Sequence, residues 1–426
     1  MNTPINAFKF GVNVEPQNRV VVTGMGVVAP NGIGLDAFWD SLINCKSGIG
    51  PITLFDVTDY PLKIAGEIKG FNLRDHFGNG CKPNRLGRQT QLGLVACKMA
   101  ADDAGLTKES LKGRGPLHLV VGICSAAADI IESAKEIIMT RGADRVRPYM
   151  VGACQPHAIS AAMIQIFDVQ TSVTTISSAC PSGLDAVALA TKMIKEGKTD
   201  LVVVGAADSP LSNTGVAGFS AAGIPSLSKD FPPEEISRPF DAKRSGVVLS
   251  EGAGFLVLER LDSALARGAQ PLMEILGGAT VTDTPGAAGM EGLFHSMSMA
   301  LVNAGMYPDQ VDYICANACS DHGGDRAEVE WVKKLFGERA YQIPVSSIRG
   351  VTGHPLAAAG LFQVISCALM IKHQKIVPTA NLRNPDSECD LDHVPLEARS
   401  AKINVAMANG HGMGGENSTL IMKSLS

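Results

Sequence analysis

Residues 171–197 read TSVTTISSACPSGLDAVALATKMIKEG, and the change of pattern within this stretch decides the fold. A β-branched run that favours a strand stops before Cys180, and an alanine-rich run typical of a helix begins just after it. Pro181 suits the first helical position because its missing N–H needs no partner there, and Gly183 lets another backbone come close. The sequence therefore predicts a strand, a sharp turn and a packed helix, with Cys180 at the junction.

A cysteine at the start of a helix has the properties of an activated nucleophile. The positive end of the helix dipole favours the thiolate, and the first backbone N–H groups can bind an oxyanion. The alternative is a small buried cysteine that only fills space, which is common for this residue type. The strand-turn-helix context of Cys180 favours the nucleophile.

Strand-like and helix-like patterns alternate along the whole chain. Apolar β-branched runs occur at residues 19–28, 118–124, 172–178, 200–208, 271–281, 311–318, 342–347 and 402–410. Helical patterns such as residues 89–106 and 328–337 separate them. This alternation predicts an α/β fold whose sheet is mostly parallel. We expect two similar halves, residues 1–265 with the nucleophilic cysteine and residues 266–426.

Composition excludes several classes of protein. The chain has 426 residues, of which 45% are hydrophobic, so it can bury a large core. A formal net charge of -5 and 5% aromatic residues give no surface suited to nucleic acid. Ten scattered cysteines fit reduced thiols, and residues 1–18 lack a signal-peptide pattern, so we expect a cytoplasmic protein. The longest apolar run, residues 355–371, contains Ala, Gly and Gln and predicts a buried core helix instead of a membrane span.

Residues 313–328 read YICANACSDHGGDRAE and are the second stretch with dense chemistry. Cys315, Cys319 and His322 lie at a spacing that loosely fits zinc, but a structural zinc site usually takes four ligands. No second pair of cysteines or histidines follows nearby. We therefore expect no metal here.

The turn around Cys180 resembles the active-site elbow of the β-ketoacyl-acyl carrier protein synthases of the thiolase superfamily, most closely the II-type elongating enzymes. Residues 20–56, residues 237–259, VTGHPLAAAG at 351–360 and NGHGMGGENSTLIM at 409–422 resemble further signatures of that family, in the same order. The resemblance implies a duplicated, five-layered α/β/α/β/α thiolase fold. It also implies a homodimer, or a heterodimer with another ketosynthase-like subunit.

The resemblance further implies the substrate and its carrier. Cys180 would take an acyl chain as a thioester from an acyl carrier protein. No separate cofactor is implied, because the substrates are carried on the phosphopantetheine of that protein.

One departure from the family lies in residues 313–328. His354 matches the family's second active-site histidine. Alignment on the acidic pair Asp325 and Glu328 places Asn317 where the first histidine usually lies. An asparagine amide can donate a hydrogen bond to a thioester oxygen, but it cannot exchange a proton near neutral pH. The resemblance therefore implies a catalytic loop whose histidine is replaced.

Further family positions are also changed. Two threonines that commonly bind pantetheine, a lysine, a glutamate and a gating phenylalanine are replaced, in this order, by Cys319, Asp321, Arg349, Gln363 and Met413. The carboxylate of Asp321 is costly in an apolar channel unless it is paired, so we expect the pantetheine arm to be held differently. His322 could pair with Asp321, act as a displaced base, or be a solvated loop histidine.

The C-terminal Gly-rich loop has two implied roles. A cysteine, an asparagine and a histidine in this order also resemble biosynthetic thiolases, whose corresponding loop carries a second cysteine as base. His411 lies close to that cysteine's place, and it could replace the base or fill the space of a family aromatic residue. The resemblance also implies an oxyanion hole made of the Cys180 and Met413 N–H groups, with glycines that let the chain turn at positions Gly412, Gly414 and Gly415.

Three functions remain open. The first is a ketosynthase-like acyltransferase that loads Cys180 and condenses the chain with a carrier-protein-bound extender, in fatty acid or polyketide biosynthesis. The second is acyl transfer without decarboxylative condensation. The third is a non-catalytic dimer partner like a chain-length factor, although such partners usually lack the cysteine that this chain retains. A degradative thiolase is disfavoured, because the signatures follow the synthase pattern.

Overall fold

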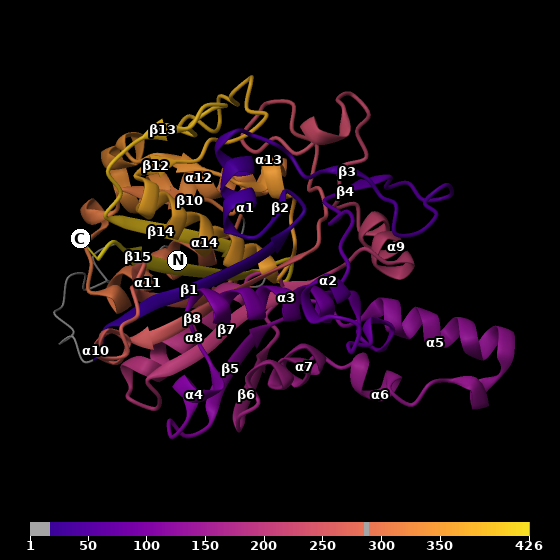
Figure 1. The fold of residues 1–426 in the computed structure, drawn as a ribbon. Coiled ribbons are helices and arrows are strands. Elements are labelled where there is room, and N and C mark those ends of the chain that lie inside the picture. Colours follow the sequence, from indigo (N-terminus) through magenta and orange to yellow (C-terminus); the bar gives the residue numbers. More distant parts are fainter. Residues whose placement is uncertain (1–17, 285–288, 426) are drawn as a thin grey trace.

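The computed structural model describes residues 18–284 and 289–425 (Figure 1). Within these residues the main sheet runs through both halves of the chain, in the order β11-β10-β14-β15-β9-β1-β8-β7-β5-β6. Its strands are β1 (Val20–Ala29), β5 (Leu117–Gly122), β6 (Thr171–Ile176), β7 (Leu201–Asp208), β8 (Gly252–Arg260), β9 (Met273–Thr282), β10 (Tyr313–Cys315), β11 (Val345–Ser346), β14 (Val405–His411) and β15 (Glu416–Lys423). The sequence predicted each of these strands except β8 and β15.

The sheet is mixed, so the prediction of a mostly parallel sheet is wrong. β5 is parallel to β6 and β7, and β10 is parallel to β11 and β14. The other neighbours pair antiparallel, and β8 and β15 take part in most of these pairs. The two strands that the sequence pattern did not reveal are therefore the ones that reverse the direction. An antiparallel neighbour needs only a short turn, as residues 412–415 provide between β14 and β15.

Helices form three layers around this sheet. α3 (Arg88–Asp103) packs on β1, β7 and β8, and α11 (Glu291–Ala304) packs on β9 and β15 and against α12 (His322–Phe336). α8 (Ser182–Lys195) contacts β5 and β7 of the first half and β9 and β15 of the second. α14 (Ala358–His373) likewise contacts β7, β8 and β14. Figure 1 shows the strands of the first half and those of the second half on opposite sides of β1. Because α8 and α14 contact strands of both halves, they form a central helical layer. The layers therefore follow the predicted order α/β/α/β/α.

Further α-helices and short strands surround this framework. They are α1 (Leu35–Ile43), α2 (Arg74–Phe77), α4 (Lys108–Leu111), α5 (Ala128–Arg141), α6 (Met150–Ala153), α7 (Ala158–Phe167), α9 (Asn213–Ala221), α10 (Leu261–Ala266), α13 (Arg349–Thr352), β2 (Gly32–Ile33), β3 (Gly50–Pro51), β4 (Ile64–Ala65), β12 (Lys375–Ile376) and β13 (Arg399–Ser400). β1, which precedes residue 265, pairs with β9, which follows it. The division of the chain into two halves at residue 265 remains a prediction.

The apolar run near the C-terminus is the buried helix that the sequence predicts. All residues of α14 from 358 to 371 are buried. In the part of the chain that the structure describes, no helix is long and apolar enough to cross a membrane. Small residues allow this close packing: a Cβ at Gly183 would lie 2.4 Å from the Ala357 carbonyl oxygen, which confirms the close backbone approach expected there.

This contact gives a first prediction. The Gly183→Ala variant should lose about 1–3 kcal/mol of its free energy of unfolding, because backbone atoms must move to admit the methyl group. Gly218 of α9 is the matched control, since no heavy atom lies within 4 Å of its added Cβ. Gly218→Ala should leave stability unchanged or raise it by up to about 1 kcal/mol. Denaturant unfolding of both variants checks the pair, and equal stabilities would contradict the packing described here.

Candidate active site

Cys180 lies in the turn between β6 and α8. Ala179 adopts the left-handed conformation with φ of 56°, which is costly for a residue with a Cβ and makes the turn sharp. The Ser182 hydroxyl accepts the Ser178 N–H at 2.8 Å and donates to the Ala179 carbonyl at 2.6 Å. The helix begins at Ser182, so Pro181 is its cap, one position earlier than expected. These contacts hold the Cys180 side chain at the edge of a cavity.

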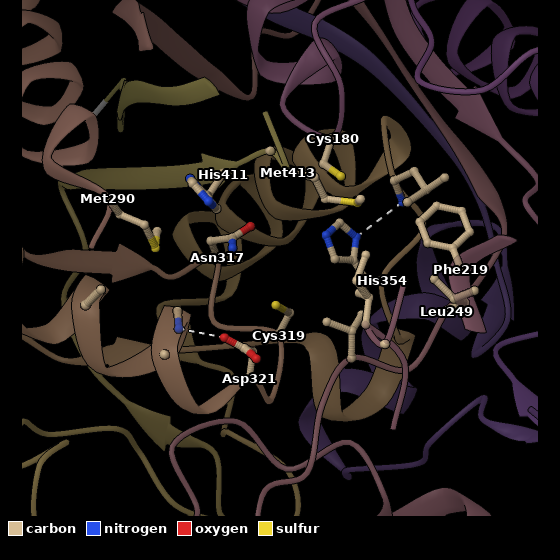
Figure 2. A pocket seen from close by; sticks show the side chains of 18 of the residues that line it. Cys180, Phe219, Leu249, Met290, Asn317, Cys319, Asp321, His354, His411 and Met413 are labelled. Atoms are coloured by element: carbon tan, nitrogen blue, oxygen red, sulfur yellow. Dashed lines mark hydrogen bonds between the residues drawn. The ribbon is translucent and has the colours of Figure 1, made fainter. Parts of the chain in front are cut away.

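The cavity has a volume of about 430 Å³ and brings together most of the expected site residues. Figure 2 shows its lining side chains, with Cys180, His354, Asn317 and His411 pointing toward the same space. Much of the wall is apolar and comes from Phe219, Ile224, Val247, Leu249, Met290 and Leu356. An apolar cavity with a few polar groups near a cysteine suits a hydrophobic acyl chain.

His354 faces Cys180 from the loop between α13 and α14. Its backbone N–H donates to the Val248 carbonyl at 2.8 Å. Its Nδ1 accepts the Leu356 N–H at 3.2 Å, a contact drawn in Figure 2. Because Nδ1 accepts, the neutral ring carries its proton on Nε2, which is the nitrogen free for the cavity.

The environment of Cys180 holds the pKa of its thiol well below the ordinary value. The largest cause is a hydrogen bond from the thiol of Cys124, and burial opposes it. The charge and hydrogen bond of His354 and the charge of Arg349 also lower the Cys180 pKa. The site therefore favours a thiolate, as the helix start alone predicted.

A pH dependence follows from this pKa. Ordinary thiols lose reactivity as the pH falls below their pKa of about 8.5, because the thiolate is the nucleophile. Because the Cys180 pKa is lowered, alkylation of Cys180 by iodoacetamide should stay fast at pH values well below that ordinary pKa. Cys45, whose pKa is raised by burial, is the control and should slow steeply over the same range. Mass spectrometry of the two alkylated peptides gives both rates, and parallel profiles would contradict the activated thiolate.

Asn317 follows β10 and is fixed through its backbone. Its N–H donates to the Glu328 carboxylate at 3.0 Å, and the Ala318 N–H donates to the same carboxylate at 2.9 Å. Glu328 also accepts the Asn409 side-chain amide at 3.1 Å. The Asn317 side-chain amide forms no hydrogen bond with any described residue and lines the cavity. It is free to bind a ligand oxygen.

Arg349 and Gln363 lie behind the cavity wall. The Gln363 amide donates to the carbonyls of Cys315, Ala316 and Asn409, so it ties the end of β10 to the end of β14. Its oxygen accepts from the Arg349 guanidinium at 3.2 Å. Both side chains are buried, and neither lines the cavity. Gln363 therefore has a structural place, and Arg349 acts on the site through its charge.

The turn between β14 and β15 places a backbone donor at the cavity. Neither the Cys180 N–H nor the Met413 N–H has a hydrogen-bond partner among residues 18–284 and 289–425. Unpaired donors on two sides of a nucleophile are what an oxyanion hole requires. The Met413 side chain is 63% exposed and lines the same cavity.

The expectation that Gly412, Gly414 and Gly415 all serve to let the chain turn is wrong for two of them. Only Gly415 has a left-handed backbone, with φ of 88°. At Gly412 and Gly414 an added Cβ would lie 2.7 and 2.5 Å from the Glu416 carboxylate. These two glycines therefore make room for that carboxylate, which accepts the Gly414 N–H at 3.1 Å.

His411 ends β14 and lines the cavity beside Asn317 (Figure 2). Its Nδ1 lies 2.9 Å from the side-chain oxygen of Asn417. The Asn417 amide group donates to the Asp283 carboxylate at 3.0 Å, which fixes its orientation. His411 is therefore the donor to Asn417, and in the neutral ring its Nε2 keeps a free lone pair. That nitrogen has the chemistry of a base.

Asp321 and Cys319 line the cavity on the side away from the elbow. The Asp321 carboxylate caps α12 and accepts the Gly324 N–H at 2.7 Å, so the helix start stabilises its charge. Burial raises the Cys319 pKa well above its ordinary value. His322 is exposed and does not line the cavity, so its solvated alternative fits the structure.

The remaining acidic residue of the loop is structural. Asp325 is fully buried, accepts the Phe240 N–H at 2.9 Å and lies 3.8 Å from the Arg244 guanidinium. Burial raises its pKa to about 7. Within the described residues no group of three or more His, Cys, Asp or Glu side chains could hold a metal ion.

Sequence reasoning missed two residues next to Cys180. Cys124 follows β5 and donates a hydrogen bond to the Cys180 sulfur. Asp208 ends β7, is fully buried, and accepts the N–H groups of Cys124 at 2.8 Å and Ala357 at 3.2 Å. Burial raises the Asp208 pKa to about 7. Each is the last residue of a strand run that the sequence predicts, so a place at a strand end was the available signal.

The fold and this cavity define the class of protein: a thiolase-like α/β protein with a buried cysteine at a helix start, facing a histidine. The family model for the beta-ketoacyl synthase N-terminal domain matches residues 17–264, and the model for the C-terminal domain matches residues 274–383. The chain belongs to the beta-ketoacyl synthase family. It is a ketosynthase of the kind found in fatty acid and polyketide biosynthesis, and the predicted resemblance is confirmed.

Curated relatives align over almost the whole chain. A polyketide beta-ketoacyl synthase 1 of Streptomyces halstedii is 38% identical over 416 residues, which cover 95% of this chain and 97% of the relative. The 3-oxoacyl-[acyl-carrier-protein] synthase 2 of Staphylococcus aureus (strain COL) is 36% identical over 415 residues, which cover 96% and 99%.

Solved structures show the same fold. The ishigamide ketosynthase/chain length factor superposes with a TM-score of 0.88 at 30% identity, covering 96% of this chain and 100% of that one. A type II polyketide acyl carrier protein in complex with its ketosynthase bound to the hexaketide gives a TM-score of 0.87 at 30% identity, with the same coverage. The predicted thiolase fold is confirmed.

Proposed function

We propose that this ketosynthase accepts an acyl chain on Cys180 and condenses it with an extender unit carried by an acyl carrier protein. The observation that carries the proposal is the cavity itself. It combines an activated cysteine, two free backbone N–H groups and an apolar wall. These features match the three needs of acyl transfer: a nucleophile, a site for the oxyanion and a place for the chain.

Loading begins with attack of the Cys180 thiolate on the thioester carbonyl of the carried chain. The carbonyl oxygen becomes negatively charged and is stabilised by the N–H groups of Cys180 and Met413. When the tetrahedral intermediate collapses, the pantetheine sulfur leaves and takes up a proton. The acyl group then remains on Cys180, with its chain against the apolar wall formed by Phe219 and Leu249.

In condensation, the extender thioester binds opposite the acyl-cysteine. The His354 Nε2–H and the Asn317 amide donate hydrogen bonds to its carbonyl oxygen, which stabilise the enolate formed as carbon dioxide leaves. The enolate carbon attacks the acyl carbonyl and displaces the Cys180 thiolate. Asn317 supplies hydrogen bonding only, and His411, with its free lone pair, is the group available to accept a proton.

The partners of this chain belong to the same proposal. One structural neighbour is described as an acyl carrier protein with its ketosynthase, and another as a ketosynthase/chain length factor. We infer that an acyl carrier protein delivers both substrates on phosphopantetheine, without a separate cofactor, and that the chain acts as a homodimer or as one subunit of a heterodimer.

Intact-mass analysis tests the proposed function. The protein is incubated first with an acyl carrier protein bearing a fatty acyl chain, and then with malonyl carrier protein. We expect an acyl adduct on the ketosynthase, which disappears as a β-ketoacyl carrier protein forms. An adduct that persists after malonyl carrier protein is added would indicate transfer without condensation. Absence of any adduct would favour the non-catalytic partner.

Acyl transfer without decarboxylative condensation is the second candidate, and the replacement at Asn317 favours it. If the asparagine acts by hydrogen bonding, Asn317→Ala should weaken catalysis by about 0.5–1.5 kcal/mol, with a further loss if a partner group stays unsatisfied. Asn317→His restores a group that can exchange protons. A rise in decarboxylation of malonyl carrier protein in this variant would support transfer as the native reaction.

Two other outcomes of the changes at position 317 would assign Asn317 a different role. If Asn317→His abolishes activity, the asparagine belongs to a reorganised site, and His411→Ala should be equally damaging. If neither change at position 317 alters loading or condensation, Asn317 has no catalytic role, and the non-catalytic partner gains support.

A further inference from the structure

Cys124 lies beside the nucleophile turn, and the proposed reaction gives it no role beyond lowering the Cys180 pKa. It follows β5, whose parallel neighbour β6 leads directly to Cys180. The Ile123 N–H donates to the Ile176 carbonyl at 2.9 Å, which extends this pairing past the end of both strands. On the other side of the elbow, the Ser182 hydroxyl oxygen lies 3.1 Å from the Ile123 carbonyl oxygen. Backbone contacts on both sides therefore hold the two cysteines together.

Cys124 and Cys180 lie at the ends of neighbouring parallel strands, and a hydrogen bond from Cys124 is the largest cause of the lowered Cys180 pKa. The backbone of Cys124 is anchored by the Asp208 carboxylate, which accepts its N–H at 2.8 Å. A Cβ at Gly122 would lie 2.5 Å from the Ser182 carbonyl oxygen, so the segments that carry the two cysteines touch backbone to backbone. The fold therefore places the two cysteines on segments that are in contact.

The chemistry of the two sulfur atoms is complementary. The shared hydrogen bond lowers the Cys180 pKa, and the same bond, together with burial, raises the Cys124 pKa above its ordinary value. Cys180 is thus the thiolate that attacks an electrophile, and Cys124 keeps its proton beside it. A thiolate that lines a cavity and has a second cysteine nearby is the arrangement of a reversible oxidation site.

We propose that Cys180 and Cys124 are a reversible modification site, in which a hydroperoxide converts them into an internal disulfide. The Cys180 thiolate attacks one peroxide oxygen, the O–O bond breaks, and a sulfenic acid forms as hydroxide or alkoxide leaves. The Cys124 sulfur attacks the sulfenic sulfur, the S–O bond breaks, and the Cys124 proton leaves with that oxygen as water. The cysteine pair loses two electrons and the peroxide gains them. A thiol reductant reverses the disulfide.

This reaction protects the nucleophile from irreversible oxidation. Without a neighbouring thiol, a sulfenic acid can be oxidised further to sulfinic and sulfonic acids, which thiols do not reverse. A second contacting pair, Cys315 and Cys367, provides a contrast within the same molecule. Both are 0% exposed, and neither lines the cavity, so a peroxide has no route to them. The inference rests on the proposed role of Cys180 as the reactive nucleophile.

Peptide mapping of the full, reduced chain tests the proposal. The protein is treated with hydrogen peroxide, free thiols are alkylated, and intact mass and tryptic peptides are measured without reduction. We expect loss of two hydrogen atoms without added oxygen, a cross-link between the Cys124 and Cys180 peptides, and full reversal by dithiothreitol. In Cys124→Ser, Cys180 should instead gain oxygen atoms that dithiothreitol does not remove.

Cys154→Ser is the matched control, because Cys154 is partly exposed near the end of α6 and shares a tryptic peptide with Cys180. It should leave the cross-link unchanged. A cross-link from Cys180 to Cys319 would overturn the proposal, and so would equal over-oxidation of the wild type and Cys124→Ser. If a variant fails to fold, the peptide map of the wild-type protein still decides.

Acyl loading of the reduced protein is measured in parallel. A cross-link without acyl loading would contradict the proposed function but would still support the disulfide.

Discussion

Cys180→Ala should abolish covalent acyl uptake. In the described residues Cys180 is the cysteine that combines a helix start, a lowered pKa and a place at the cavity. Its removal takes away the atom that bonds to the chain, so no adduct should form on incubation with acyl carrier protein. Intact-mass analysis measures this loss directly.

The same experiment carries its own control. Cys319 lines the cavity, but burial raises its pKa, so Cys319→Ser should still accept the chain. An adduct on another cysteine in Cys180→Ala would show that the nucleophile has been assigned to the wrong residue. Uptake in both variants would point to acyl transfer through a different site.

His354→Ala should suppress condensation by about 10²–10³-fold, the usual effect of removing a donor to a developing oxyanion. The histidine faces both the sulfur and the cavity, and it also helps to hold the Cys180 pKa low. Loading should therefore also slow, but less than condensation. The rate of β-ketoacyl product formation, compared with the rate of adduct formation, separates the two effects.

His322→Ala is the matched control for this variant. Its ring is exposed, and its backbone carbonyl, which the substitution keeps, accepts the Arg244 guanidinium at 3.0 Å. We expect near wild-type condensation. The reverse ranking of the two histidines would mean that residues 313–328 are misread and that His322 has moved into the role of the family's first histidine.

Local patterns were enough to predict the elbow at Cys180, and the resemblance to the β-ketoacyl synthases implied Asn317 and His354 from two further signatures. Cys180, Asn317 and His354 each lie in a stretch whose own sequence marks it, and the structure brings all three together. Cys124 and Asp208 were not predicted, because their positions depend on which strands are neighbours in the sheet. Alternation of strands and helices indicates that a sheet forms but not that β5 lies between β6 and β7.

The missed strand β15 has a different physical cause. Asn417, Ser418 and Thr419 are polar, yet all three are 0% exposed. The Thr419 hydroxyl donates to the Asn409 side chain at 3.0 Å and Asn417 bonds to His411, so partners on β14 allow the burial of these two residues. A buried polar strand has no apolar alternation to reveal it. Arg349 also depends on a partner, Gln363, to which its buried guanidinium donates. The sequence could therefore match Arg349 to the family's lysine, but it could not predict that the side chain lies behind the wall of the cavity.

The central position of α14 has a consequence for how the chain is made. A ribosome releases β7 and β8 long before α14, the helix that contacts both of them, has been synthesised. Until then α8 is the only one of the two central helices that covers β7 and β8, and the edge of β1 still lacks β9. Uncovered apolar surface and open strand edges are what chaperones bind and what leads to aggregation. The nascent first half therefore passes through a long interval in which it needs protection, which ends only when the C-terminal third of the chain folds into its centre.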